Sequence, residues 1–314
     1  MEKTIGFIGL GRMGAAIAGR LLAHGYRLTI WNRTPEKARP LLEKGAIWAE
    51  RPEETALPGG IVVSMLADDT AVEEIFGPRT GLLPRLGPEG VHVSLSTIGS
   101  ATARRLAQMH ERFGVALVAA PVFGRPDAAA AGSLVVVCSG PAEARQRVAP
   151  LLAVIGRATF DFGDLPEAAC VAKLCGNFLL AAAVEALAEA LALAEKSGVD
   201  PQRWLEMVTT TLFACPAYQN YGRILNERRF QPAGFTLRLG VKDLRLILDE
   251  GRRHLVPLPA ADLIHDRLQA AWNRGRAEWD WSAVALEAFE AAGLSGRPAA
   301  ADVAAGAEAE SAGS

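Results

Sequence analysis

The 314-residue sequence has almost no net charge, few aromatic residues and only four cysteines. Lys and Arg number 33 against 35 Asp and Glu, which leaves a formal net charge of −2. We therefore expect neither a nucleic-acid partner nor an acidic membrane surface as a partner. The cysteines show no C-x-x-C spacing and no histidine at metal-ligand spacing, so we expect reduced thiols and no metal site.

Long uninterrupted apolar runs are also missing. The longest apolar stretch, 177–194, is interrupted by Glu185 and Glu189, so we expect no membrane-spanning segment. The first ten residues, MEKTIGFIGL, contain a glycine-rich turn and lack the pattern of a secretory signal peptide. These features favour a cytoplasmic protein.

A nucleophilic triad has no recognisable pattern in this sequence. The five histidines are scattered, and none stands beside a serine or cysteine motif. They are His24, His92, His110, His254 and His265. The pair Asp68-Asp69 predicts the start of a helix rather than a metal site.

The first half of the chain alternates short apolar runs with helical patterns, which predicts an α/β fold. The expected strands are 4–8, 27–31, 60–66, 91–95, 115–119 and 134–139. Such alternation predicts a mostly parallel, doubly wound sheet of the Rossmann type with helices on both faces. We place this domain at residues 1–164.

The second half shows only helical patterns and predicts an all-α domain at residues 165–295. It begins with one long interdomain helix over 167–197, which is apolar around nearly its whole circumference. A single small domain can hardly bury such a helix, so we expect a homodimer in which it packs against the partner. Residues 296–314 are rich in Ala, Gly, Glu and Ser and are expected to form a disordered tail.

The segment Ile5-Gly-Phe-Ile-Gly-Leu-Gly-Arg-Met-Gly14 carries the clearest functional motif. Gly9 allows a tight turn, Gly11 lets the backbone approach a pyrophosphate, and Gly14 lets the following helix pack on the strand. The helix N-terminus at Arg12 and Met13 would then face the pyrophosphate with free N–H groups. This motif predicts a dinucleotide cofactor.

The end of the second strand predicts NADP(H) rather than NAD(H). Enzymes that use NAD usually carry Asp or Glu there, whereas this chain has Asn32-Arg33-Thr34. Arg33 can bind a 2′-phosphate through two N–H groups, Asn32 and Thr34 can donate to it, and Lys37 adds charge. The alternative is that Arg33 is an ordinary solvated loop residue.

The start of the long helix carries a second signal, Lys173 and Asn177, four residues apart on one helix face. A lysine and an asparagine on an otherwise apolar helix are unusual. Burial lowers the pKa of a lysine towards neutrality, which suits proton transfer. A surface lysine near a helix N-terminus is the plain alternative.

Four motifs in the same order resemble the β-hydroxyacid dehydrogenase family over residues 3 to about 295. They are GFIGLGRMG, the segment that contains Pro121, the K-x-x-x-N of Lys173 and Asn177, and Val241-Lys-Asp-Leu244. The family includes 3-hydroxyisobutyrate dehydrogenases and glyoxylate/succinic semialdehyde reductases, and imine reductases are more distant relatives. The resemblance implies an NADPH-dependent oxidoreductase that acts on a carbonyl or hydroxyacid.

The resemblance also implies roles for individual residues. Lys173 would be the general acid in reduction, and Asn177 would orient the substrate. Lys242 would close over the cofactor, and Asp243 would position that lysine or the substrate. The cofactor cleft would be lined by residues that follow two strands, namely Met65, Leu66 and Thr97.

The substrate segment departs from the pattern of the family. Where the family typically reads Pro-Val-Ser-Gly-Gly, this chain has Phe123, Gly124 and Arg125 after Pro121-Val122. Phe123 removes a hydroxyl donor and adds an apolar wall. Arg125 either binds a substrate carboxylate or points to solvent. With Tyr218, these residues predict a more apolar substrate pocket.

Two alternatives remain open at this point. The apolar substrate segment mildly favours imine reduction in the same pocket, whereas Lys173 argues against a dedicated imine reductase. Some relatives bind the cofactor without catalysis, and loss of the lysine is their usual mark, so Lys173 argues against this reading too.

Overall fold

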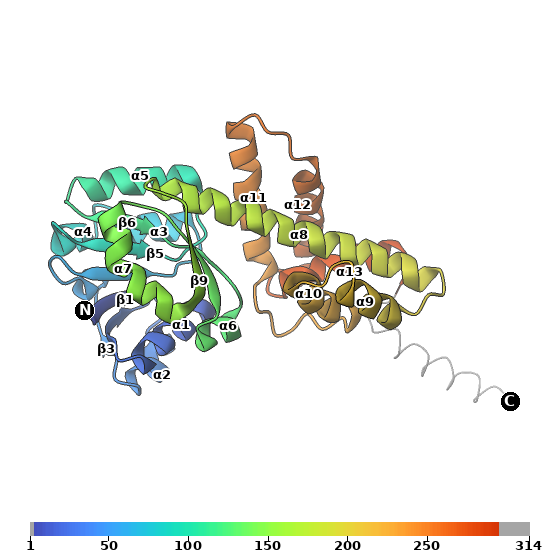
Figure 1. Cartoon of the computed structure of the whole chain (residues 1–314), viewed down its shortest axis with the longest axis horizontal. Helices are drawn as coiled ribbons and strands as arrows, with labels where there is room; N and C mark the ends of the chain where they lie inside the picture. The colour runs from blue at the N-terminus through green and yellow to red at the C-terminus, as the bar shows by residue number, and fades with distance from the viewer. Residues whose placement is uncertain (1–2, 295–314) are drawn as a thin grey trace. The chain divides into compact units, whose positions relative to one another are not determined.

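The computed structural model describes residues 3–294, and the chain divides into two compact units between Cys175 and Gly176 (Figure 1). This division falls inside one long helix, which therefore contributes to both units. The domain boundary expected between residues 164 and 165 lies just before that helix begins at Pro166, and it stays a prediction. The expected tail, 296–314, lies outside the described residues.

The first unit is built on a six-stranded parallel sheet with the order β3-β2-β1-β4-β5-β6. The strands are β1 (Thr4–Ile8), β2 (Arg27–Trp31), β3 (Ile47–Trp48), β4 (Ile61–Ser64), β5 (Val91–Ser94) and β6 (Ala116–Ala119). The order reverses at β1, which lies between β2 and β4. Ligands of such sheets bind outside the carboxyl ends of the strands at this switch point. The doubly wound Rossmann fold predicted from the sequence is confirmed.

Helices cover both faces of this sheet, because successive strand residues point to opposite sides. Phe7 and Val63 face a core with α1, α2, α6 and α7, whereas Ile8 and Val62 face a core with α3, α4 and α5. The segments are α1 (Arg12–Ala23), η1 (Pro35–Ala38), α2 (Arg39–Leu42), η2 (Pro52–Thr55), α3 (Asp69–Phe76), α4 (Leu82–Leu86), α5 (Ser100–Glu111), α6 (Pro126–Ala131) and α7 (Ala142–Ile155). Asp68 caps α3 through the N–H of Ala71, as the sequence predicted.

A second, three-stranded sheet corrects part of the sequence-based expectation. The expected strand 134–139 contacts the large sheet through a bridge between Ser139 and Ala119, but its main part forms the middle of a small sheet with the order β7-β8-β9. These strands are β7 (Val122–Phe123), β8 (Leu134–Cys138) and β9 (Gly156–Asp161), and β7 runs antiparallel to β8. β9 was not predicted, because its residues are mostly exposed and show no apolar alternation.

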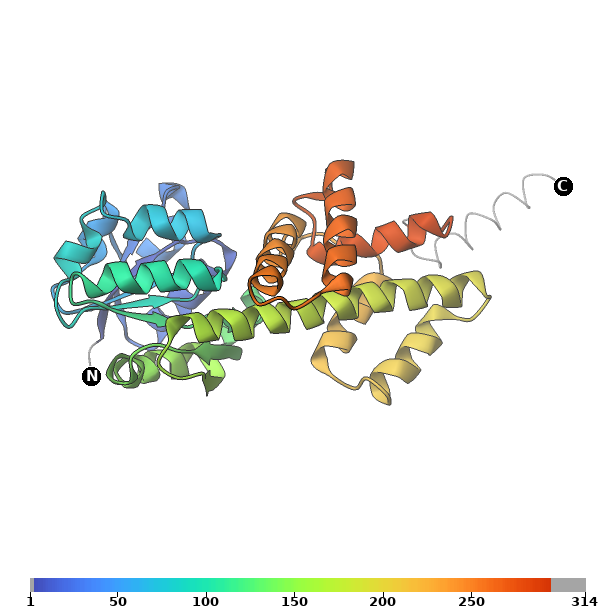
Figure 2. The ribbon, with the colours of Figure 1, turned by 90° about the horizontal axis from the view of Figure 1, so that it is seen from above.

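The long helix α8 (Pro166–Lys196) leads into the helical unit, as predicted (Figure 2). The segments that follow are α9 (Pro201–Thr210), α10 (Pro216–Asn226), α11 (Leu237–Arg253), α12 (Pro259–Ala271), the π-turn η3 (Trp272–Arg276), η4 (Trp281–Val284) and α13 (Ala285–Ala291). Among the described helices, only α8 is long and apolar enough to cross a membrane. Because 56% of its most apolar stretch is buried within the protein, it resembles the core helix of a globular domain.

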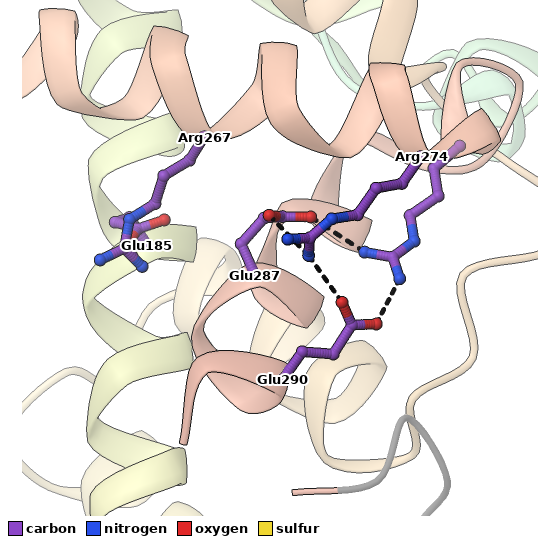
Figure 3. A network of polar contacts seen from close by, with 6 residues as sticks. Glu185, Arg267, Arg274, Glu287 and Glu290 are labelled. Carbon is purple, nitrogen blue, oxygen red and sulfur yellow. Dashed lines mark hydrogen bonds and ion pairs between the residues drawn. The ribbon is translucent and has the colours of Figure 1, made fainter. Parts of the chain in front are cut away.

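The helical unit contains carboxylates that are buried against arginines (Figure 3). Glu185 of α8 lies 2.5 Å from Arg267 of α12, and its side chain is 8% exposed. Glu287 forms an ion pair with Arg274 at 2.9 Å and accepts a hydrogen bond from Arg276 at 3.0 Å. Burial raises the pKa of Glu185 to about 7 against the opposing effect of Arg267.

Candidate functional site

The glycines of the predicted dinucleotide loop are held by close backbone contacts. Gly9 has a φ of +96°, and a Cβ there would collide with the carbonyl oxygen of Met65. A Cβ at Gly14 would collide with the carbonyl oxygen of Gly9, so α1 packs directly on the loop. Both positions need glycine for the fold itself, whatever the loop binds.

Gly11 differs from these two glycines because nothing in the fold requires it. Its φ of −67° suits any residue, and a Cβ built there meets no atom within 4 Å. Gly11 is the N-cap of α1, whose first turn has no side-chain cap and no acidic residue. A bare glycine before an uncapped helix N-terminus leaves room and N–H donors for an anion such as a pyrophosphate. These residues therefore fit a dinucleotide cofactor.

Asn32, at the end of β2, supports the loop rather than pointing outward. Its Oδ1 accepts the N–H of Leu10 at 2.8 Å, and its Nδ2 donates to the carbonyl of Thr34 at 2.8 Å. The side chain thereby links the loop after β1 to the loop after β2. Arg33, Thr34 and Lys37 are exposed, and their contact with a phosphate stays a prediction.

The segments that follow β4 and β5 are tied to the same region of the sheet. The N–H of Met65 donates to the carbonyl of Ile8 at 2.9 Å, and the N–H of Leu66 donates to Ser96 Oγ at 2.8 Å. Thr97 follows Ser96 directly. The carboxyl ends of β1, β4 and β5 therefore lie next to one another, where the switch-point rule places a ligand.

Lys173 is buried in the first unit, with 6% of its surface exposed. Its Nζ lies 3.7 Å from the ring centroid of Phe123, over the face of the ring. The first turns of α8 are fixed because Ser139 Oγ donates to the carbonyl of Pro166 and accepts the N–H of Ala169, both at 2.9 Å. The structure thus brings two sequence-predicted site residues, Lys173 and Phe123, into contact.

Asn177 lies one helical turn after Lys173 and belongs to the helical unit. Its Nδ2 donates to Asp243 Oδ2 at 2.6 Å, and Lys242 Nζ lies 2.8 Å from Asp243 Oδ1. Asp243 is fully buried, and both of its oxygens are used in this way. The structure therefore brings Asn177, Lys242 and Asp243 together, with the carboxylate orienting the other two.

The remaining candidates of the substrate segment are each fixed by local structure. Gly124 has a φ of +138°, and a Cβ there would lie 2.6 Å from Leu134 Cδ2. Arg125 is half-buried, with its Nη1 inaccessible to solvent. Tyr218 of α10 stacks on Phe213 with the ring centroids 4.6 Å apart. Their contacts with a substrate stay predictions.

Sequence reasoning missed a buried line of polar side chains in the first unit. Ser64 Oγ lies 2.8 Å from His92 Nε2, and His92 Nδ1 lies 2.9 Å from His110 Nε2. His110 Nδ1 lies 2.6 Å from the carbonyl of Leu106, which can only accept. Burial lowers the pKa of His110 to about 4 and that of His92 well below its usual value, so both rings are neutral. The hydrogen bonds then run one way, from Ser64 through His92 and His110 to Leu106.

This line cannot act as a nucleophilic triad, because Ser64, His92 and His110 are fully buried. The line of polar side chains could have been found from β5, because successive side chains of a strand point to opposite faces of the sheet. Val91 and Val93 face one side of the sheet, so His92 must face the other, where Phe76 stacks on it at 3.5 Å.

Comparison with known proteins identifies both parts of the chain. Residues 4–172 match the family described as the NAD binding domain of 6-phosphogluconate dehydrogenase. Residues 168–287 match the family described as NAD-binding of NADP-dependent 3-hydroxyisobutyrate dehydrogenase. Together the two matches cover both units.

Individual relatives are similar to this chain along most of their length. The uncharacterized oxidoreductase YfjR of Bacillus subtilis is 41% identical over 89% of this chain and 98% of its own. The 3-hydroxyisobutyrate dehydrogenase of Pseudomonas aeruginosa is 35% identical over 78% of this chain and 84% of its own.

Solved structures show the same fold. The 3-hydroxyisobutyrate dehydrogenase of Mycobacterium tuberculosis with L-serine has a TM-score of 0.81 and 28% identity, covering 91% of this chain and 99% of its own. Psf3 in complex with NADP+ and 2-OPP has a TM-score of 0.79 and 27% identity, covering 89% of this chain and 98% of its own. A reductive aminase from Aspergillus terreus in complex with NADPH has a TM-score of 0.61 and 26% identity, covering 90% of this chain and 98% of its own.

The glycine loop, the buried lysine and the helical unit are thus found together in a chain whose two parts both match nicotinamide-dependent dehydrogenases. With a relative that is 41% identical over nearly its whole length named as an oxidoreductase, the sequence and the fold agree. This chain belongs to the β-hydroxyacid dehydrogenase family of NAD(P)-dependent oxidoreductases.

Proposed function

We propose that this protein is an NADPH-dependent reductase of small carbonyl compounds in which Lys173 is the general acid. One observation carries the proposal: Lys173 is 6% exposed and lies in the same unit as a loop in which Gly11 has no structural reason to be glycine. Burying an ammonium group costs free energy, and buried ionisable groups of this kind are concentrated at functional sites.

The proposed reaction divides the work between cofactor and protein. When bound, a reduced nicotinamide would supply the hydride that the carbonyl carbon needs. Lys173 donates a proton from Nζ to the carbonyl oxygen, which yields the alcohol, and water restores the proton on Lys173. Asn177, oriented by Asp243, holds the substrate through its amide. Lys242 is proposed as a cofactor contact, positioned by the carboxylate of Asp243.

The test of this mechanism is Lys173→Ala, with Lys196→Ala as the matched control. Lys196 lies at the exposed end of the same helix. Loss of the general acid is expected to lower kcat by about 10²- to 10⁴-fold. Lys196→Ala should leave kcat unchanged. Full turnover by Lys173→Ala in an NADPH-oxidation assay would remove the mechanism.

The preference for NADPH over NADH rests on the residues that follow β2. Arg33 and Thr34 are exposed there, Lys37 is nearby, and the position that often holds a carboxylate in NAD enzymes is Asn32. The NADP+ bound to the neighbour Psf3 supports the same preference. Arg33→Ala should raise the KM for NADPH much more than that for NADH. An equal rise for both cofactors would contradict the preference.

The proposed contacts of the pyrophosphate are Gly9, Gly11, Arg12, Met13 and Gly14. Other cofactor contacts are Met65, Leu66 and Thr97, and the proposed substrate contacts are Phe123, Gly124, Arg125 and Tyr218. Gly11→Ala tests the cofactor part, because a methyl group there meets open space and should leave the fold intact. It is expected to weaken NADPH binding at unchanged thermal stability.

Imine reduction is the second candidate function. The half-buried Phe123 makes this part of the pocket apolar, and the reductive aminase of Aspergillus terreus shares the fold. NADPH oxidation measured across semialdehydes, 2-keto acids, bulkier ketones and cyclic imines separates the two. A cyclic imine turned over faster than every carbonyl compound would replace the first proposal with the second.

We also propose that the protein is a cytoplasmic homodimer that pairs through α8. This helix exposes an apolar stripe in which Leu179 is 67% exposed and Leu193 is 69% exposed. The two lie on one face of the helix, four turns apart. Sedimentation of the protein as a monomer at micromolar concentration would contradict the dimer, whereas Leu193→Glu should convert a dimer to monomer.

A further inference from the structure

We propose that Phe123 is the positioning residue of the general acid, because its ring face holds the ammonium of Lys173. This inference rests on the proposed function and deepens it. It concerns how the proton donor is kept in place, and two residues of the first unit carry it.

The geometry is that of a strong cation–π contact. Lys173 Nζ lies 3.7 Å from the centroid of the Phe123 ring, well within the range of about 6 Å over which such contacts act. Lys173 is 6% exposed, so water screens the contact little. The contribution of a cation–π pair grows when the cation is desolvated in this way.

The backbone around Phe123 is fixed, so the ring is a rigid support. Phe123 pairs with Val135 of β8 in the antiparallel sheet, and the N–H of Val137 donates to the carbonyl of Pro121 at 3.0 Å. Gly124 follows at a φ of +138°, a conformation that a larger residue would not adopt. The ring itself packs on the core that includes Ile98, Ala169 and Cys170.

The support from the other side is equally fixed. Ala169 and Cys170 of α8 are buried in that same core, one turn before Lys173. A long lysine side chain loses rotamer freedom when it is held in one place. The ring face offsets this loss for the protonated form, which is the form that donates the proton. Phe123 therefore favours both the position and the protonation state that a general acid needs.

The first experiment observes the contact without any substrate. The chain has six lysines, so the Hε resonances of Lys173 are few enough to assign by their loss in Lys173→Met. The ring current of Phe123 should shift these resonances upfield in the unaltered protein and in Phe123→Tyr. In Phe123→Leu, which keeps an apolar side chain but has no ring, they should return to the position of ordinary lysines. An unchanged position in Phe123→Leu would overturn the proposal, whatever the enzyme turns over.

The second experiment measures whether the contact serves catalysis. Phe123→Leu is expected to lower kcat by about 3- to 30-fold, the range that corresponds to a cation–π pair, with a smaller change in KM. Phe123→Tyr should restore most of kcat. In the Lys173→Ala background, Phe123→Leu should have no further effect on kcat, because the ring acts through the lysine.

The outcomes separate this inference from the proposed function. Additive effects of Phe123→Leu and Lys173→Ala on kcat, or equal kcat values for the Leu and Tyr variants, would overturn the positioning role alone. Full activity of Lys173→Ala would overturn the proposed mechanism while leaving the resonance shift intact. Phe160→Leu, which replaces a ring of β9 that is 56% exposed, is the control and should change neither readout.

Discussion

Each unit of this protein contains a buried polar cluster, and the two clusters are built in opposite ways. The cluster of the first unit is uncharged: Ser64, His92 and His110 form a single line of hydrogen bonds that ends on a backbone carbonyl. The helical unit buries charge: Glu185 and Glu287 lie against Arg267 and Arg274 (Figure 3). The neutral line avoids the desolvation of ions, whereas the charged network must offset it by pairing.

The difference shows in how each cluster responds to protons. In the first unit, protonation of either histidine would place a charge where no counterion is part of the line. In the helical unit, protonation of Glu185 removes a charge that burial already disfavours. The two clusters therefore give the free energy of unfolding opposite pH dependences.

The largest effect is expected from removing the middle of the neutral line. His92→Ala deletes the ring that stacks on Phe76 at 3.5 Å and leaves Ser64 and His110 without their partner. The expected loss is about 3 to 5 kcal/mol in the free energy of unfolding, measured by urea denaturation. His254→Ala, at an exposed helix end, is the control and should change stability by less than about 0.5 kcal/mol. A loss below about 1 kcal/mol for His92→Ala would contradict a structural role of the line.

A smaller effect is expected from pH. Between pH 6.5 and about 4 the unfolded chain binds a proton at His110 that the folded chain does not, so stability falls as pH falls. Between pH 4.5 and about 7 the folded chain holds a proton on Glu185 that the unfolded chain releases, so stability falls as pH rises.

Glu185→Gln separates the two contributions. Relative to the unaltered protein, this variant should gain about 1 kcal/mol of stability at pH 8 and little at pH 4.5, since partial solvent screening reduces the full linkage value. Arg267 keeps its ion pair with Glu189 in this variant. Urea unfolding at pH 4.5, 6 and 8 measures the difference. A Glu185→Gln variant with the same pH profile as the unaltered protein would show that Glu185 does not titrate as inferred.

The smallest effect is expected at the rim of the charged network. The side chain of Arg274 is 50% exposed, whereas that of Arg276 is 14% exposed, and both pair with Glu287. Arg274→Ala should therefore cost about 0.5 kcal/mol, and added salt should weaken the interaction. Arg276→Ala should cost more than Arg274→Ala in the same thermal unfolding measurement. The reverse order would mean that burial does not rank these pairs.

Much of the fold could be predicted because its signals are local. The glycines at 9, 11 and 14 follow a strand and precede a helix within twenty residues, and the period of α8 is visible along its whole length. Lys173 and Asn177 stood out because they are polar residues on an apolar helix. The sequence also names Gly11 as a cofactor contact, which stays a prediction, and the structure adds that a Cβ there would meet no atom within 4 Å.

The features that sequence reasoning missed depend on contacts between distant segments. Ser64, His92 and His110 come from β4, β5 and α5, and only the sheet order brings them together. The expected contact of Asn32 with a phosphate stays a prediction, and the structure adds that its amide holds the backbone of Leu10 and Thr34. The small sheet was not predicted because β7 has only two residues and β9 lacks an apolar pattern. In each case a long-range partner, rather than a local preference, decides the outcome.

The position of the unit boundary inside α8 has a consequence for recombination between related genes. The boundary between Cys175 and Gly176 separates the codon of Lys173 from that of Asn177. A crossover at that point would join Lys173 of one parent to Asn177 of the other within one continuous helix. Such an exchange would replace Asn177, Lys242 and Asp243 together, while Lys173 and Phe123 stayed those of the first parent.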